Sequence, residues 1–253
     1  MAPVEDSGGT GLTPGLEAAW GLRERPSKGP RPGLSVHAIV DTAVAVAASE
    51  GLSAVSMGRV AKELGVSTMS LYRYVGAKDE LYVLMQDAAV GAPPPPPPPG
   101  TGWREGLTRW AWAQRAVFRR NLWLLRVPIS GPPATPNSVA WWEAGMEALA
   151  GTALDEGAKI SVVLLVGGFV RSEAGMTADL GAAMAATGET PEQVMARYGR
   201  TLRRLADPER YPRVARALDS GVLDQPDDPD HEFRFGLERL LDGVRILLER
   251  SDG

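Results

Sequence analysis

Seven consecutive prolines, Pro93–Pro99, constrain the fold of this chain more than any other feature of its sequence. Proline lacks a backbone N–H and its ring clashes with the preceding helical turn, so the run cannot lie inside a helix or a central strand. As polyproline II it would span roughly 22 Å at about 3.1 Å per residue. We therefore interpret residues 91–101 as a stiff linker between two parts of the chain. A ligand for a proline-recognising domain is the alternative interpretation.

Both parts have helical patterns. Before the linker, apolar residues of 34–90 recur at the i, i+3, i+4, i+7 spacing of one helical face. After it, five helices are predicted, at about 102–126, 137–151, 155–180, 190–206 and 231–250. A loop rich in proline and aspartate is expected at 207–230, and no strand pattern or repeat is found. The prediction is an all-α fold, with a three-helix N-terminal domain and connecting helix at 34–90 and a larger helical domain at 102–253.

Composition excludes several classes of chemistry. The 253 residues include no cysteine, so the chain has no disulfide, thiolate zinc site or thiol nucleophile. With only His37 and His231, a multi-histidine metal site within one chain is also excluded. No dinucleotide-binding glycine motif, phosphate-binding loop or nucleophile elbow is present, so we expect no enzyme, no cofactor and no metal. Asp227, Asp228 and Asp230 are interpreted as a solvated acidic loop, with a weak divalent-ion site as the alternative.

Charge and apolar runs limit the partners. The formal net charge is −4, so any nucleic-acid site must be a local basic patch on a mildly acidic molecule. The first residues carry Glu5 and Asp6 and no apolar run, which is unlike a signal peptide. The longest apolar stretch, Ile160–Val170, is much shorter than the roughly 20 residues of a membrane span. We expect a buried core helix there, no membrane partner and a cytoplasmic protein.

The sharpest motif lies at 52–82. A helix capped by Ser56, a turn at Gly65 and a second short helix capped by Ser67 are typical of a helix-turn-helix. The outward side of the second helix suits a major groove, where arginine reads guanine, methyl groups touch thymine and tyrosine hydroxyls bind phosphate. Its predicted DNA contacts are Thr68, Met69, Ser70, Tyr72, Arg73 and Tyr74. Lys78, at the start of the next helix, is predicted to hold a phosphate. An ordinary helical hairpin with a polar face is the alternative.

The order of residues in this stretch resembles the DNA-binding domain of the TetR family of bacterial transcriptional regulators, most closely its tetracycline-repressor branch. The resemblance is carried by Val60-Ala61, Leu64-Gly65-Val66, Ser70-Leu71-Tyr72, Tyr74-Val75 and Lys78 with Leu81. It implies further DNA contacts at the start of the first motif helix, namely Ser56, Met57, Gly58 and Arg59. That branch has a base-reading arginine where this chain has Gly58 and a tryptophan at Arg73, so a different operator sequence is expected.

The resemblance also implies a function. The expected protein is a homodimeric repressor that a small apolar or aromatic effector releases from a palindromic operator of double-stranded DNA. A helical enzyme or carrier that binds a small molecule and keeps a vestigial DNA-binding domain is the alternative. No equivalent of the magnesium-chelating residues of the tetracycline repressors is found, which argues against a metal–tetracycline ligand.

Residues 1–33 are rich in glycine and proline and lack a helical period, so we interpret them as a flexible arm. Its second half is basic through Arg23, Arg25, Lys28 and Arg31. Two interpretations stay open. The arm is either a solvated tail or a minor-groove contact of the kind that other helix-turn-helix proteins make.

Six of the seven tryptophans lie between residues 103 and 142. They either fill the core or line a pocket for a planar, largely apolar ligand. Given the resemblance, we favour the pocket. Its predicted lining residues are Trp110, Gln114, Phe118, Trp123, Trp142 and Met146.

Two predicted helices, at about 155–180 and 231–250, carry wide apolar stripes. Gly167-Gly168 in the first would let another helix approach closely. Packing within one chain is the simple explanation of such stripes. In the TetR family the dimer is a four-helix bundle built from this pair of helices, so the resemblance implies a homodimer through them.

Overall fold

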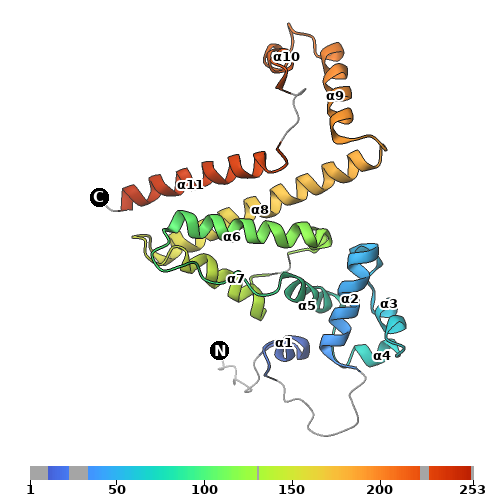
Figure 1. Ribbon diagram of the computed structural model, residues 1–253. Helices are drawn as coiled ribbons and strands as arrows, with labels where there is room; N and C mark the ends of the chain where they lie inside the picture. Colours follow the sequence, from blue (N-terminus) through green and yellow to red (C-terminus); the bar gives the residue numbers. More distant parts are fainter. Residues whose placement is uncertain (1–10, 23–33, 130, 223–227, 252–253) are drawn as a thin grey trace, which may run out of the picture.

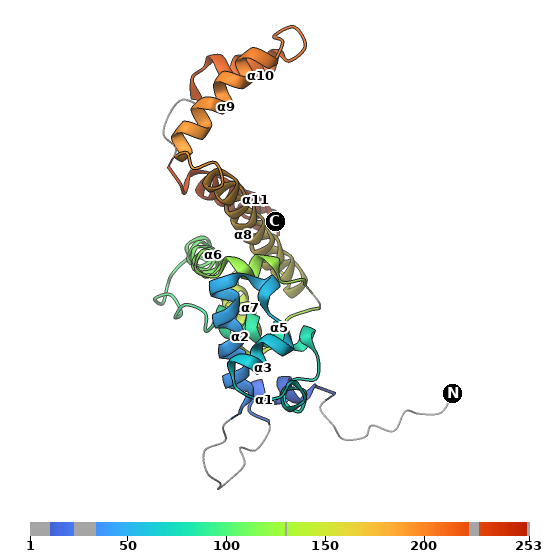
Figure 2. The same ribbon diagram turned by 90° about the vertical axis from the view of Figure 1, so that its right-hand side faces the viewer.

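The computed structural model describes residues 11–22, 34–129, 131–222 and 228–251. Within these ranges the regular elements are helices and there is no strand, which confirms the all-α prediction. Figure 1 shows three parts in sequence: an N-terminal head at one end, a layer of long helices in the middle, and a helical pair that stands away from the body. The view in Figure 2 shows the same separation.

The head, residues 34–90, consists of α2 (Val36–Glu50), η1 (Leu52–Ala54), α3 (Met57–Glu63), α4 (Thr68–Leu71) and α5 (Lys78–Val90). Serine side chains start three of these helices, because Ser35, Ser56 and Ser67 each accept a hydrogen bond from a backbone N–H three residues later. The inward faces meet in one core, and Ile39 and Leu71 within it are fully buried.

The larger domain follows the proline linker, which contains neither helix nor strand. Its helices are α6 (Trp103–Arg120), η2 (Leu122–Arg126), α7 (Pro136–Glu147), α8 (Glu156–Ala185), α9 (Pro191–Leu205), α10 (Pro212–Asp219) and α11 (His231–Ser251). The helix predicted at 102–126 is therefore two elements, because the backbone leaves the α region at Asn121 (φ −133°, ψ 65°). The first long helix of the dimer pair runs five residues further than predicted, to Ala185.

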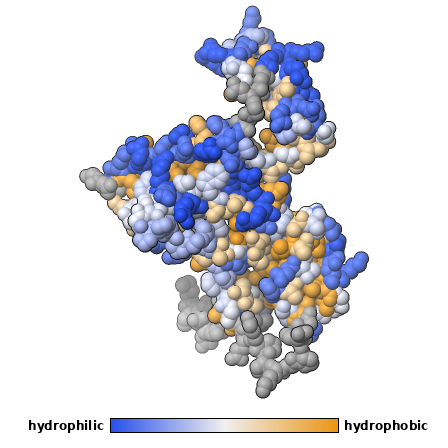
Figure 3. All heavy atoms as spheres, in the orientation of Figure 1, coloured by the Kyte–Doolittle hydropathy of each residue, from blue (hydrophilic) through white to orange (hydrophobic). Residues whose placement is uncertain are grey.

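The loop predicted at 207–230 is partly wrong, since α10 lies within it. Pro212 occupies the first turn of α10, where a missing N–H costs nothing. Val214, Ala215 and Leu218 then give the short helix one apolar side. The α9–α10 excursion (Pro191–Asp219) stands off the body in Figures 1 and 2. The face of it seen in Figure 3 is mostly hydrophilic.

The flexible arm predicted at 1–33 also contains a helix, α1 (Pro14–Ala19), so that prediction is wrong for these residues. Thr13 caps its first turn, and Gly15 is buried against the head. Thr13 at the N-cap and Pro14 in the first turn are local helix-start signals that the prediction missed, whereas the contact that attaches the helix to the head, with Glu80, lies 65 residues further along the chain.

Candidate DNA-binding and ligand-binding sites

α3 and α4 form the predicted helix-turn-helix. Gly65 makes the turn between them with φ +68°, a conformation that favours glycine. The backbone N–H of Val66 donates to the carbonyl of Ala61 at 3.0 Å and closes the end of α3. α4 is a single α-helical turn and so is shorter than predicted, although the N–H of Val75 still bonds the carbonyl of Leu71 at 3.0 Å.

The outward side of α4 presents the predicted contact residues. Met69 is 74 % exposed, Tyr72 is 45 % exposed, and Arg73 is exposed beside them. The guanidinium of Arg73 lies 3.5 Å from the Ser70 hydroxyl, which is only a weak bond, so the arginine is available to a base or phosphate. Thr68 and Ser70 lie half-buried at the same surface, and Tyr74 packs partly against the head core.

The start of α3 departs from the expectation at two positions. Met57 is only 5 % exposed and belongs to the head core, so its side chain does not reach DNA. Arg59 is held at both ends, by Glu50 at 2.7 and 3.0 Å and by Glu63 at 2.9 Å. These hydrogen bonds raise the pKa of Arg59. In this arrangement Arg59 braces α3 against the end of α2.

The remaining predicted contacts on the head are free to meet DNA. Ser56 is exposed at the α3 cap, and a methyl group added at Gly58 would meet no atom within 4 Å. Lys78 is exposed at the start of α5, with its ammonium 5.1 Å from the centre of the Tyr82 ring. The predicted arm contacts Arg23, Arg25, Lys28 and Arg31 lie outside the described residues.

Trp110, Phe118 and Trp123 of the predicted ligand residues belong to the buried core, and two polar atoms of the predicted set are buried there without a partner among the described residues. Trp110 is buried, and its indole N–H donates to the Trp141 carbonyl at 2.9 Å. On the same face of α6, the Gln114 Oε1 atom is buried and has no hydrogen-bond partner among the described residues. The indole nitrogen of Trp123, 6 % exposed, is likewise buried and unpartnered. Most buried polar atoms in proteins are paired, so each of these two requires an explanation.

The other three predicted ligand residues differ in how far they are buried. Phe118 is buried, with the Arg171 guanidinium of α8 5.8 Å from its ring centre. Burial lowers the pKa of Arg171, which donates to the Val127 carbonyl at 2.9 Å. Met146 is half-buried, whereas Trp142 is 38 % exposed and therefore a poor wall for a pocket.

Two comparisons with known proteins match this architecture. A family model described as the tetracyclin repressor-like C-terminal domain matches residues 95–248, and one described as bacterial regulatory proteins of the tetR family matches residues 39–85. The HTH-type transcriptional repressor DrrR1 of Streptomyces coeruleorubidus is 35 % identical over 251 residues, which are 99 % of this chain and 92 % of DrrR1. The chain belongs to the TetR family of bacterial transcriptional regulators.

Solved structures agree. The ActR protein of Streptomyces coelicolor in complex with actinorhodin is 26 % identical, with a TM-score of 0.68 over 86 % of this chain and 98 % of ActR. ActR in complex with (S)-DNPA is 27 % identical, with a TM-score of 0.67 over 85 % of this chain and 98 % of ActR. This TetR-family chain is thus a DNA-binding transcriptional repressor with a ligand-binding helical domain, and the predicted resemblance is confirmed.

The two predicted dimer helices of this TetR protein leave apolar rows in solvent. On α8, Leu164, Leu165 and Met176 are 68, 52 and 67 % exposed. A groove of about 460 Å³ runs between α8 and α11 and is lined by Leu165 and Leu247, among others. By length and composition α8 is the one described helix that could cross a membrane, which alone is a weak indication because interface helices have the same composition.

The glycine pair of α8 has two separate roles. A methyl group added at Gly167 would lie 3.3 Å from the Trp110 ring, so this glycine makes room for a tryptophan of the same chain. A methyl group at Gly168 would meet nothing within 4 Å. Only Gly168 is therefore free for a helix from outside, which corrects the prediction for Gly167.

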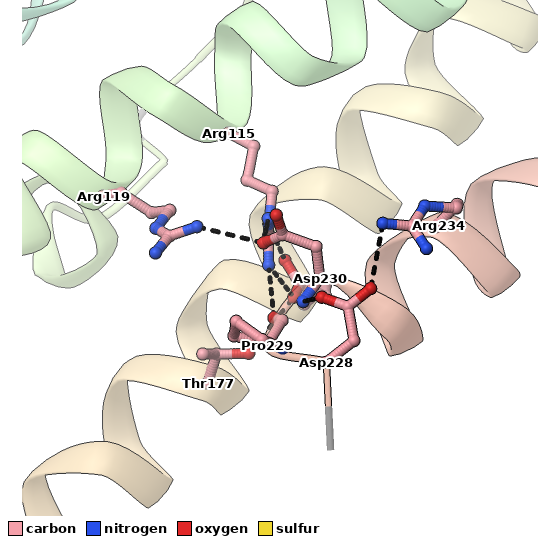
Figure 4. Close-up of polar contacts among 8 residues, drawn as sticks. Arg115, Arg119, Thr177, Asp228, Pro229, Asp230 and Arg234 are labelled. Atoms are coloured by element: carbon pink, nitrogen blue, oxygen red, sulfur yellow. Dashed lines mark hydrogen bonds and ion pairs between the residues drawn. The ribbon is translucent and has the colours of Figure 1, made fainter. Parts of the chain in front are cut away.

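A buried ionic cluster joins α6, α8 and the start of α11, and the sequence patterns did not reveal it (Figure 4). Arg115, 2 % exposed, donates to both Glu173 oxygens at 3.1 Å and to Asp230 at 2.6 Å. Burial opposes its charge, but these hydrogen bonds outweigh burial and raise the pKa of Arg115. The same contact lowers the pKa of Asp230. Two further arginines pair with the described part of the acidic loop: Arg119 with Asp230, and Arg234 with Asp228.

Proposed function

We propose that this chain is a homodimeric repressor that leaves a two-fold symmetric operator when an aromatic ligand bearing hydroxyl or carbonyl groups enters the α6–α8 region. The observation that carries the ligand class is the pair of buried, unpartnered polar atoms, Gln114 Oε1 and Trp123 Nε1. Gln114 offers an acceptor to a ligand hydroxyl, and Trp123 offers a donor to a ligand oxygen. Trp110, which lies beside Gln114 at Gly167, and the buried Phe118 are proposed to supply apolar walls.

The homodimer is supported by the exposed apolar faces of α8 and α11. Contiguous apolar surface of this kind marks interaction sites in soluble proteins. A four-helix interface made of these two helices from each chain would cover it and would place two recognition segments on one side of the molecule. Two such segments fit successive major grooves when their centres are about 34–36 Å apart.

We call residues 68–73, which comprise α4 and the two residues after it, the α4 segment. Contact with DNA is proposed for five of its residues, Thr68, Met69, Ser70, Tyr72 and Arg73. Ser56, Gly58, Tyr74 and Lys78 are proposed to add contacts around it. Exposed arginine and hydroxyl groups are suited to base edges and phosphates. The basic arm residues Arg23, Arg25, Lys28 and Arg31 are proposed to reach the neighbouring minor groove. A cytoplasmic location and no catalytic role complete the proposal.

A chain of hydrogen bonds supports release of DNA by the ligand. Trp110, in the ligand cluster, donates to the Trp141 carbonyl at 2.9 Å, and Trp141 donates to the Gly91 carbonyl at 2.9 Å. Gly91 ends α5, the helix that carries the head. The Asp87 carboxylate, also on α5, accepts from the N–H of Asn137 at 2.9 Å at the start of α7. A ligand that shifts Trp110 or α7 therefore moves α5 and the head with it.

Linkage between the two sites provides the test. A ligand that prefers the released state by a hundredfold per site supplies about 2.7 kcal/mol, and bound operator must weaken ligand binding by the same factor. Tryptophan fluorescence titrations with actinorhodin and (S)-DNPA, the compounds in the ActR complexes, would be run with and without an operator selected from random DNA. Equal affinities in both titrations would show that the ligand site is not coupled to DNA.

A further inference from the structure

The short helix α1 is attached to the head through one buried carboxylate. Glu80 of α5 is 9 % exposed. Its Oε1 atom accepts the backbone N–H of Gly15 at 2.9 Å and the hydroxyl of Thr13. Its Oε2 atom accepts the N–H of Gly76 at 2.6 Å. Because Gly76 lies between α4 and α5, five residues after the last residue of α4, the same carboxylate holds both the N-terminal residues and the connection that follows the helix-turn-helix.

The other end of this segment is attached to the ligand-binding domain. The indole N–H of Trp20 donates to the Ala134 carbonyl at 2.9 Å. Ala134 lies two residues before α7, the helix that receives the Asp87 contacts. Residues 13–20 thus bridge the two domains by a route that is separate from the α5 backbone. They also lie outside the family-model matches, which begin at residue 39.

The bridge is held by hydrogen bonds more than by dense packing. A cavity of about 450 Å³ lies between α1, α5 and residues 129 and 131–135, and Leu16, Val83, Val90 and Pro133 are among its walls. Leu16 and Ala19 of α1 still pack partly against the core, but a space of this size removes part of the close packing that is the norm in protein interiors. A segment held in this way can detach without unfolding either domain.

Gly15 is the point of closest approach. A methyl group added there would lie 2.5 Å from the Glu80 Oε1 atom and 2.8 Å from Leu84 Cδ1. The Glu80 carboxylate is already fixed by Gly76, so it cannot move aside without losing that bond. Only glycine allows the backbone to come this close.

We propose that residues 13–20 act as a strap that fixes the angle between the head and the ligand-binding domain, with Glu80 as the positioning residue that links the strap to the recognition segment. While the strap is bound, the head cannot swing about the end of α5. Release of the strap widens the range of head positions and so weakens operator binding. This inference rests on the proposed function, namely the homodimer, only for the experiment that measures a distance between the heads of two protomers.

Gly15→Ala tests the strap, because it displaces residues 13–20 and leaves the Glu80–Gly76 bond in place. Gly131→Ala is the matched control, since a methyl group there meets no atom within 4 Å. Hydrogen exchange is followed by mass spectrometry on the full chain. We expect peptides over 13–20 and 131–138 to exchange roughly tenfold faster in Gly15→Ala, with residues 57–75 unchanged. Unchanged exchange at 131–138 would overturn the bridge.

A distance measurement separates positioning from simple stabilisation. The chain has no cysteine, so Ala48→Cys, exposed on α2, places one spin label on each head. Pulsed electron resonance should give a broader distance distribution for Gly15→Ala than for wild type or Gly131→Ala. An identical distribution would mean that residues 13–20 only stabilise the fold and do not position the head. If wild type gives no distance between labels, the homodimer fails and the exchange experiment alone decides.

Trp20→Phe is the second variant if Gly15→Ala does not fold. Trp20 is 42 % exposed and its indole N–H bonds only the Ala134 carbonyl among the described contacts, so the change removes one end of the strap at small risk to the fold. We expect faster exchange at 131–138 and the same broadening. Glu80→Gln, which keeps the shape and an acceptor oxygen, should fall between wild type and Gly15→Ala in both measurements.

Discussion

The head keeps its large apolar side chains inside, whereas the ligand-binding domain leaves many of them in solvent. Within 34–90 the exposed large apolar residues are Met69 and Tyr72, both on the α4 segment, which is proposed to contact DNA. In the larger domain, α8 and α11 expose rows of large apolar side chains. The two buried polar atoms without a partner among the described residues, on Gln114 and Trp123, also belong to the larger domain. The head therefore exposes little apolar surface apart from that segment, while the larger domain has surfaces that a second chain and a ligand would complete.

Ion pairs differ between the two regions in the same sense. Arg59 of the head pairs with Glu50 and Glu63 at the surface, where solvent screens the charges. Arg115 of the larger domain pairs with Glu173 where both side chains are almost fully buried. A buried pair adds little net stability but is severely destabilising when half of it is removed. Removing one partner of an ion pair should therefore lower stability more in the larger domain than in the head.

The largest expected effect comes from Arg115→Met. The substitution leaves the Glu173 carboxylate buried without a cation, which should lower the free energy of unfolding of the larger domain by about 3–5 kcal/mol. Urea denaturation measures it. Arg119→Met is the control, because Arg119 touches the same Asp230 but is 58 % exposed and should change stability by less than about 1 kcal/mol. Equal effects of the two substitutions would contradict the contrast between buried and exposed pairs.

Arg73→Ala addresses the head without touching its core. We expect operator binding to weaken by about 1–3 kcal/mol if the arginine reads a base, with the unfolding transition unchanged. Fluorescence anisotropy on labelled operator measures the loss. Lys62→Ala, exposed on α3 and outside the proposed contacts, should bind within a small factor of wild type. Undiminished binding by Arg73→Ala would remove it from the interface.

Gln114→Leu should separate stability from ligand binding. Removing an unpartnered buried amide oxygen should raise the stability of the ligand-free protein by about 1 kcal/mol. The same change removes the proposed acceptor for a ligand hydroxyl, so affinity for ligand should fall. Thermal denaturation and fluorescence titration measure the two quantities. A loss of stability would mean that the amide is already satisfied and that the proposed acceptor role is wrong.

The smallest expected effect is the acid response of Asp230. Hydrogen bonding to Arg115 lowers its folded pKa below the unfolded value, which is about 3.9 for an aspartate. Its contribution to stability is therefore present at neutral pH and is lost as the pH falls from about 4 through the lower folded pKa. Unfolding curves of Asp230→Asn should show a weaker acid dependence than wild type in that range. Parallel curves would exclude the pair as an acid-sensitive contact.

The sequence predicted the features that depend on neighbouring residues. The caps at Ser56 and Ser67, the turn at Gly65 and the helical periods are local, and they placed the helix-turn-helix and most helices correctly. The strap, α10 and the Arg115 cluster were not predicted. Thr13 meets Glu80, and Arg115 meets Glu173 and Asp230, only after the chain has folded, so no local pattern records these contacts.

Local patterns also could not tell which side of a helix faces a partner. Met57, Gly58 and Arg59 are consecutive residues at the start of α3, but their environments differ. Met57 is buried, Gly58 is open to solvent and Arg59 is paired with Glu50. Likewise Gly167 and Gly168 are adjacent, but only the second faces outward. These assignments depend on how α3 and α8 are rotated against their neighbours, which packing over the whole domain decides.

The Arg115 cluster has a consequence for how this chain can change over generations. One guanidinium binds Glu173 within α8 and Asp230 at the start of α11, so it fastens both ends of the intervening segment, which holds α9 and α10 (Figures 1 and 4). The entropic penalty of closing such a loop grows only slowly with its length, by about 0.6 kcal/mol for each doubling. Residues of the α9–α10 excursion can therefore be added, removed or exchanged while α8 and α11 keep their places. The excursion is a site where new recognition properties can be acquired without redesign of the rest of the repressor.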